Sequence, residues 1–137
     1  MKLFRKITIL SLLVIFGACQ SNESKIIDSE MNFEVLQVNQ QQVGDSLKVT
    51  LNFSPKENRI SGIVCNSYSG ELTIEKTKVQ INKVVSTRKM CANGMKIEHN
   101  LLSNFEEVSH YMFDGNTLEL KNDANKTLVK ARVKKHE

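Results

Sequence analysis

The alternation of apolar and polar residues over 46–53 places the strongest constraint on the fold. In the segment SLKVTLNF every second residue is apolar, so its four apolar side chains lie on one face of an extended strand. Pro55 follows shortly afterwards and ends the strand, because proline has no amide hydrogen to donate to a neighbouring strand. The segment therefore predicts a sheet that buries one of its faces.

Similar short segments recur along most of the chain. We expect strands at 33–38, 47–53, 59–65, 71–75, 78–84, 110–113, 117–120 and 127–133. Turn sequences separate several of them, and Asp114-Gly115-Asn116 is the strongest of these, because glycine tolerates the positive φ of a tight turn. Connections this short favour antiparallel neighbours.

The period changes to that of a helix over about 94–108. One face carries the apolar residues Ile97, Leu101, Phe105 and Val108, and the opposite, polar face carries Lys96, Asn100, Asn104 and Glu107. We expect Asn93 to cap the N-terminus, with Glu98 near the positive end of the helix dipole. The predicted fold is α+β, a small antiparallel, curled, barrel-like sheet of about seven or eight short strands with one packing helix.

The first twenty residues have the pattern of an export signal. Three basic residues precede an apolar run over 7–16, and two small residues come directly before Cys19. A membrane-spanning helix needs about 20 apolar residues, so this run is too short to anchor the chain. The small-small-Cys ending resembles the lipobox of bacterial lipoproteins, in which the cysteine is acylated and becomes the mature N-terminus. We expect a lipoprotein signal peptide at 1–18 and lipid attachment at Cys19.

Two consequences follow for the remaining chain. Residues 19–32 are mostly polar and predict a flexible tether, and 33–137 has the size of one domain. Loss of Lys2, Arg5 and Lys6 with the signal leaves 16 basic against 15 acidic residues, a net charge of +1. We therefore expect no nucleic-acid partner. Gln20 follows the cysteine where Asp would favour the inner membrane, so we expect the outer membrane of a bacterial cell envelope.

Several motifs, taken in order, resemble the META domain of HslJ-like heat-inducible envelope lipoproteins. They are GIVCNSYSG at 62–70, STRKMC at 86–91, Met95 with Glu98, and then Tyr111, Gly115, Leu118 and Leu120. The resemblance extends over 33–134, although Val64 stands where the family usually has glycine. It implies an α+β domain of the outer membrane or periplasm with no established catalytic activity, associated with heat shock and with resistance to some antibiotics.

With Cys19 assigned to lipid, Cys65 and Cys91 form an even set in an oxidising compartment. They either form a disulfide or remain buried thiols. A disulfide would close a loop of 26 residues and contribute about 3 kcal/mol on the chain-entropy model. A redox role lacks the Cys-x-x-Cys spacing. His99 and His110 do not stand at zinc-ligand spacings, so we expect no metal and no cofactor.

The sequence contains no nucleophile elbow, phosphate-binding glycine loop or catalytic carboxylate pair, and we expect no catalytic residues. The remaining candidate is a structural or recognition loop formed by Asn66, Tyr68, Gly70, Thr87 and Arg88. We favour its structural interpretation, in which Asn66 bonds the backbone of a turn and Tyr68 packs its ring into the core.

The predicted function is that of a monomeric, non-enzymatic envelope lipoprotein in stress response or maintenance. It would bind another envelope component, such as a protein, through a surface of its sheet. One alternative is a small-ligand or drug-binding module that holds an apolar compound in the mouth of the curled sheet. Another is an inhibitor of a cell-wall hydrolase.

Overall fold

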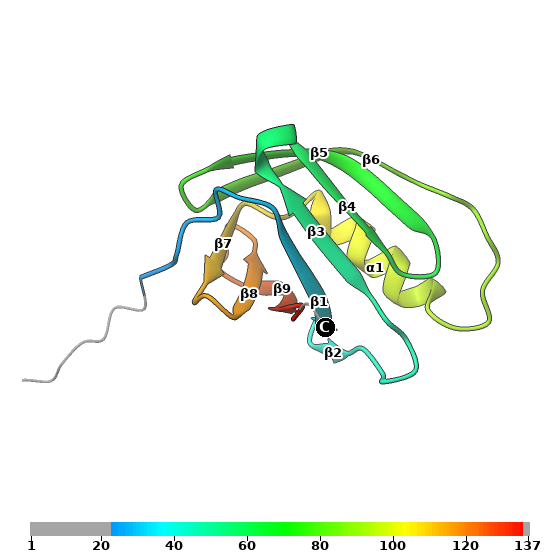
Figure 1. Cartoon of the computed structure of the whole chain (residues 1–137). Coiled ribbons are helices and arrows are strands. Elements are labelled where there is room, and N and C mark those ends of the chain that lie inside the picture. Colours follow the sequence, from blue (N-terminus) through cyan, green and yellow to red (C-terminus); the bar gives the residue numbers. More distant parts are fainter. Residues whose placement is uncertain (1–22, 136–137) are drawn as a thin grey trace, which may run out of the picture.

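Antiparallel pairing of strands that follow one another along the chain builds the sheet (Figure 1). The computed structural model describes residues 23–135. The nine strands have the order β2-β1-β3-β4-β5-β6-β7-β8-β9, and β1 also pairs with β9, which curls the sheet into a ring. The elements are β1 (Met31–Val38), β2 (Gln41–Gln42), β3 (Thr50–Ser54), the 3-10 helix η1 (Pro55–Glu57), β4 (Arg59–Ile63), β5 (Ser67–Glu75), β6 (Lys78–Ser86), α1 (Met95–Phe105), β7 (His110–Phe113), β8 (Thr117–Lys121) and β9 (Thr127–Val133).

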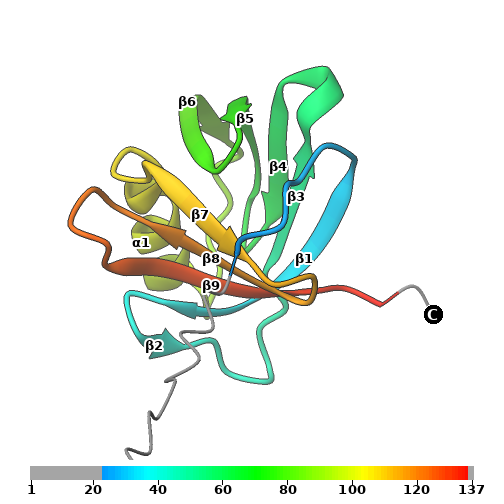
Figure 2. The ribbon, with the colours of Figure 1, turned by 90° about the vertical axis from the view of Figure 1, so that its left-hand side faces the viewer.

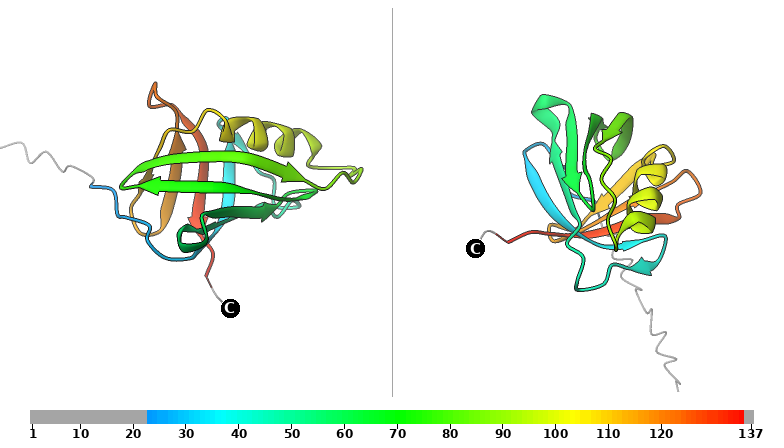
Figure 3. Two further views of the ribbon diagram at one scale, coloured as in Figure 1. Left: turned by 90° about the horizontal axis from the view of Figure 1, so that it is seen from above. Right: turned by 90° about the vertical axis from the view of Figure 1, so that its right-hand side faces the viewer.

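The ring is weakest between β6 and β7. These two strands share one register pair, Lys78 with His110, and they diverge beyond it (Figure 2). Helix α1 lies alongside β6 on this side of the ring (Figure 3). Its buried apolar residues Ile97, Leu101 and Phe105 face the core, so the helix closes the side that strand pairing leaves open.

Aromatic side chains fill the interior. Phe33 meets Phe53 and Phe113 edge to face, with ring centroids 5.8 Å apart in both pairs. Phe105 of α1 packs against Tyr68 of β5 at 5.6 Å. All five rings are buried, so the helix and the sheet share one core.

The predicted fold class is confirmed, and the strand bounds differ in detail. The strand expected at 47–53 begins at Thr50, and the strand expected at 59–65 ends at Ile63, because the chain bends over 64–66. The strand expected at 71–75 begins at Ser67. Tyr68 and Gly70 therefore lie in β5, and their assignment to a loop was wrong.

The helix is shorter than the expected 94–108 and begins differently. Asn93 does not cap it, because Gly94 occupies the N-cap position with φ 93° and makes no side-chain capping bond. Asn104 was expected to face water but is buried, and its amide Nδ2 donates to the Leu128 carbonyl at 3.2 Å. The helix ends at Phe105, and Val108 is buried after its end.

Part of the expected tether belongs to the domain. The Lys25 N–H donates to the Phe113 carbonyl at 2.7 Å, and the Phe113 N–H donates to the Ser24 hydroxyl at 3.0 Å. Ile27 is buried, and its N–H donates to the Tyr111 hydroxyl at 2.9 Å. The prediction of a flexible tether was therefore wrong for these residues, which we call the N-terminal arm (Ser24 to Ile27).

The expected signal peptide and Cys19 lie outside the described residues. Within 23–135, no helix has the length and apolar character needed to cross a membrane.

Candidate functional site

Asn66 is buried at the turn between β4 and β5, and its side chain joins three parts of the chain. Its Oδ1 accepts hydrogen bonds from the Lys89 N–H at 2.6 Å and from the Thr87 hydroxyl at 2.9 Å. Its Nδ2 donates to Glu98 Oε1 at 2.8 Å. The amide therefore links the turn to the segment after β6 and to α1.

Glu98 completes this arrangement from the first turn of α1. Its Oε2 accepts from the Asn66 N–H at 2.6 Å and from the Cys65 N–H at 3.1 Å. Both oxygens of this buried carboxylate thus have donors, and the positive end of the helix dipole favours its charge. Sequence reasoning placed Glu98 near the helix start but missed this role. The available signal was the pairing of Met95 with Glu98 in the family motif.

A disulfide joins Cys65 to Cys91, with the two Cα atoms 6.0 Å apart. It holds the β4–β5 turn against the segment that leads into α1. Arg88, in the same segment, is exposed and makes no side-chain hydrogen bond or ion pair within the part of the chain that the structure describes. We call the linked residues the Asn66 corner: Cys65, Asn66, Thr87, Cys91 and Glu98.

Tyr68 packs its ring across the neighbouring strand. It is the register partner of Gly62 on β4, and its hydroxyl donates to the Thr50 carbonyl at 2.7 Å. Burial raises the pKa of this hydroxyl well above its ordinary value. A Cβ at Gly62 would collide with the hydroxyl and with the Thr50 carbonyl. Tyr68 is therefore positioned as a core side chain with a satisfied hydroxyl.

Gly70 lies opposite an irregularity in β6. The register passes from Ser69–Val85 to Glu71–Asn82, so two residues of β6 oppose one of β5, which is the pattern of a β-bulge. Lys83, within the bulge, has φ 50°. A Cβ at Gly70 would come within 2.9 Å of both the Asn82 carbonyl oxygen and Val84 Cγ2, so the glycine makes room for the bulge.

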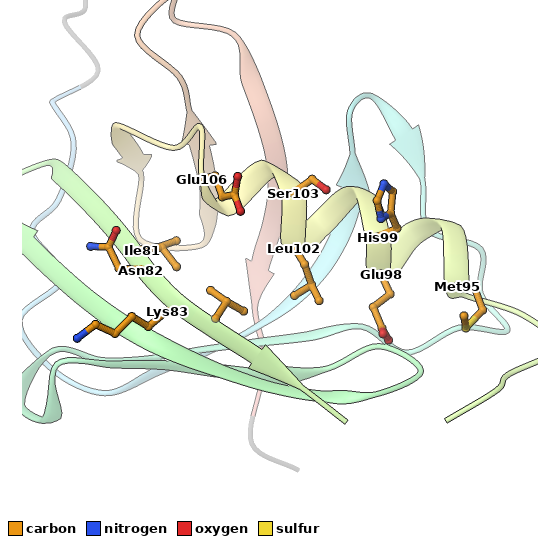
Figure 4. Close-up of a pocket in the computed structure, with 10 residues that line it drawn as sticks. Ile81, Asn82, Lys83, Met95, Glu98, His99, Leu102, Ser103 and Glu106 are labelled. Carbon is orange, nitrogen blue, oxygen red and sulfur yellow. The ribbon is translucent and has the colours of Figure 1, made fainter. Parts of the chain in front are cut away.

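Next to the Asn66 corner, a groove of about 660 Å³ separates α1 from β6. In Figure 4, Leu102 and Glu98 extend from the helix toward the strand. Leu102 and Val84, both partly buried, contribute apolar surface, while Glu106 adds an exposed carboxylate. We call this feature the β6–α1 groove, lined by Ile81, Asn82, Lys83, Val84, Met95, Glu98, His99, Leu102, Ser103 and Glu106.

The charged residues of the groove differ in whether they have partners. Lys83 directs its ammonium to Glu71 at 2.7 Å, on β5. Glu98 is fully hydrogen-bonded, whereas Glu106 forms no ion pair with any residue of 23–135. Over the same range, no three His, Cys, Asp or Glu side chains gather where they could hold a metal ion. The groove offers apolar surface, polar groups and, at Glu106, an exposed carboxylate that forms no hydrogen bond or ion pair within residues 23–135, which suits binding.

The domain matches the sequence pattern of a known family. The model of the META domain matches residues 27–135. The chain belongs to the META domain family. The match begins at Ile27, the residue of the N-terminal arm that is buried in the core, so the META domain includes the end of that arm.

Solved structures share the fold of this META domain. One NMR structure matches with a TM-score of 0.61 and 24% identity, covering 75% of this chain and 88% of the other. The NMR structure of a protein from Burkholderia xenovorans gives 0.62 and 18%, covering 81% and 85%. The crystal structure of a DUF4847 family protein from Bacteroides vulgatus gives 0.51 and 17%, covering 65% and 61%. No curated protein matches. At these identities the structural matches establish the fold alone.

Proposed function

We propose that this META-domain protein is a non-enzymatic lipoprotein of the bacterial cell envelope that binds another envelope protein. It is attached through lipid on Cys19, faces its partner from the outer membrane as a monomer, and acts in envelope stress response or maintenance. The observation that carries the proposal is the β6–α1 groove. Family membership supports the envelope setting.

The surroundings of the groove favour binding over catalysis. Glu98, the buried carboxylate in its wall, accepts hydrogen bonds from Asn66 and Cys65 through both oxygens. These donors occupy both oxygens of the carboxylate and give Glu98 a structural role in the wall of the groove. The same bonds fix the wall in place. A rigid wall suits recognition, because less conformational freedom is lost when a partner binds.

The interior of the ring is occupied by the protein's own side chains. Phe33, Phe53 and Leu118 have no exposed surface, so core packing fills the interior, which supports a partner site on the outside of the ring. The groove is instead an open cleft along one strand and one helix. This shape favours an elongated partner segment over an enclosed small molecule.

Photo-crosslinking in cells tests the proposal. A photoreactive residue at Asn82, on the groove, should capture one defined envelope protein, and the same residue at Thr73, exposed on β5, should capture much less. Absence of any specific product from positions around the whole domain would contradict partner binding. Incorporation of labelled palmitate tests the lipid anchor, and we expect the label in the wild-type protein and its loss in Cys19→Ser. A wild-type protein that incorporates no label would contradict lipid attachment at Cys19.

A further inference from the structure

We propose that the partner binds by strand addition: an extended, basic peptide segment of another envelope protein pairs with the open edge of β6 and lies in the β6–α1 groove. This inference rests on the proposed function and specifies how the partner is held. Strand addition uses main-chain hydrogen bonds for affinity and alternate side chains for specificity.

The backbone of β6 is oriented for such pairing. The Val79 N–H donates away from β5, to the Ser109 carbonyl at 2.9 Å. Two residues further along, Ile81 opposes Leu72, whose own N–H points away from β6 to the Asn58 carbonyl at 2.9 Å. Ile81 and Leu72 therefore form a non-hydrogen-bonded pair, and the N–H and C=O of Ile81 face the groove.

Beyond Val79 this edge has no strand partner within residues 23–135, because β7 pairs with β6 only at Lys78. The β-bulge at Lys83 then shifts which residues of β6 direct their backbone groups toward β5 and which direct them outward. The Thr87 N–H donates toward β5, to the Ser67 carbonyl at 3.0 Å, so Val84 and Ser86 are the next residues whose backbone groups face outward. The edge thus offers backbone N–H and C=O groups for pairing at three positions, Ile81, Val84 and Ser86.

Natural proteins protect open edges with charges or by covering them, and neither protection is complete here. Lys83 projects from the bulge, but its ammonium bonds Glu71 on the side of β5. Helix α1 stands beside the edge, and the groove of about 660 Å³ separates the two. The groove runs along this edge, where it is lined by Ile81, Asn82, Lys83 and Val84.

The side chains of the groove indicate the chemistry of the added strand. Leu102 and Val84, which line the groove and are only partly buried, offer apolar contacts to alternate residues of a paired segment. Glu106 is exposed and unpaired within the described chain, so a lysine or arginine on the segment complements it. An alternating apolar sequence that carries a basic residue fits these contacts.

A random nonapeptide library displayed on phage, selected against the full protein with its native N-terminus, tests strand addition. Selected peptides should alternate apolar residues and carry Lys or Arg. Each selected peptide is made in two N-methylated forms, one modified at the odd-numbered residues and the other at the even-numbered residues. The two forms should bind with different affinities, because only one of them loses the N–H donors that face β6. Binding is measured by fluorescence anisotropy. Equal binding of the two forms, or a library without binders, would overturn the proposal.

Two matched protein variants locate the charge contact. Glu106→Lys should weaken peptide binding about tenfold, a change of about 1.4 kcal/mol, whereas Glu107→Lys should leave it unchanged, since Glu107 is exposed and lies outside the groove. Equal effects would contradict the assignment. Hydrogen exchange at the Ile81 amide should slow on binding, and an unchanged rate would place the peptide elsewhere.

The outcomes separate this inference from the proposed function. If the cellular partner crosslinks from Thr73 and not from Asn82, partner binding stands and strand addition at β6 is wrong. If no position captures a partner, the proposed function itself fails. A dimer detected by sedimentation, in which two copies of the chain pair through β6, would also overturn the inference. The occupant of the groove would then be a second copy of the chain.

Discussion

At the scale of single residues, Glu98 determines whether the Asn66 corner holds together. Its carboxylate receives the N–H groups of Cys65 and Asn66 and the Asn66 amide. Glu98→Ala leaves these donors without their acceptor, and a buried unsatisfied donor costs about 1–3 kcal/mol. We expect urea denaturation to show a loss of about 2–3 kcal/mol in the free energy of unfolding. Glu107→Ala, at an exposed position, is the control, and an equal loss there would contradict the prediction.

Gly62 makes a second single-residue prediction. A methyl group at this position would overlap the Tyr68 hydroxyl and the Thr50 carbonyl, and the buried ring cannot move aside without disturbing the core. We expect Gly62→Ala to lower the free energy of unfolding by more than about 2 kcal/mol. Gly44→Ala is the matched control, because a Cβ there meets nothing within 4 Å. Similar denaturation midpoints for the two variants would refute the argument.

At the scale of elements, the disulfide fastens the β4–β5 turn to the segment before α1. The sequence separation of its cysteines is 26, so replacing both Cys65 and Cys91 with alanine should lower the free energy of unfolding by about 3 kcal/mol. Adding a reductant to the wild-type protein should produce a similar loss. The prediction would be contradicted by free thiols at both positions in protein taken from cells, together with a free energy of unfolding that does not change when reductant is added.

Glu119 on β8 links its strand to β9 and makes stability depend on pH. It pairs with Lys121 at 2.9 Å and Lys130 at 3.5 Å, and the hydrogen bond from Lys121 lowers the pKa of its carboxyl. A lowered folded-state pKa adds stability above the ordinary carboxyl pKa, and this stability is lost as the pH falls through the lowered value.

Glu119→Gln removes that contribution. We expect the variant to lose about 1 kcal/mol at neutral pH and to show a flatter dependence of stability on pH below about 5 than the wild type. Denaturation curves collected across acidic pH measure both effects. An unchanged pH dependence in the variant would show that another carboxylate is responsible.

The sequence predicts elements better than it predicts contacts between them. Alternation located most strands, and the 3.6-residue period located α1. The start of β5 was missed because Ser67, Tyr68 and Gly70 lack a regular apolar alternation, and their place is set by pairing with β4 and by the bulge. Asn104 was misplaced because its buried partner, the Leu128 carbonyl, is 24 residues away.

The β6–α1 groove follows from the divergence of β6 and β7, which depends on how the whole ring closes. No local sequence pattern therefore predicts the groove. Family motifs marked Asn66 and Glu98 without indicating that they bond each other. The network of the corner is a tertiary property, and so is the open edge.

At the scale of the whole molecule, the N-terminal arm ties the domain to its proposed anchor. Bonds between the arm and β7 begin at Ser24, so five peptide units separate that residue from Cys19, a reach of at most about 18 Å. Lipid on Cys19 would thus hold the domain close to the membrane surface. This short reach favours a partner that is itself at or near the same membrane.

The arm also makes the folding of the domain depend on residues before the first strand. Ile27 has 2% of its surface exposed and belongs to the core shared by the sheet and α1, whereas the adjacent Ile26 is 55% exposed. Truncating a buried isoleucine to alanine removes packing and leaves a cavity, which costs about 2–5 kcal/mol. Ile27→Ala should therefore lower the free energy of unfolding by that amount in a single cooperative transition, while Ile26→Ala should change it by less than about 0.5 kcal/mol. Equal, small effects in urea denaturation would mean that the arm is not part of the folding unit.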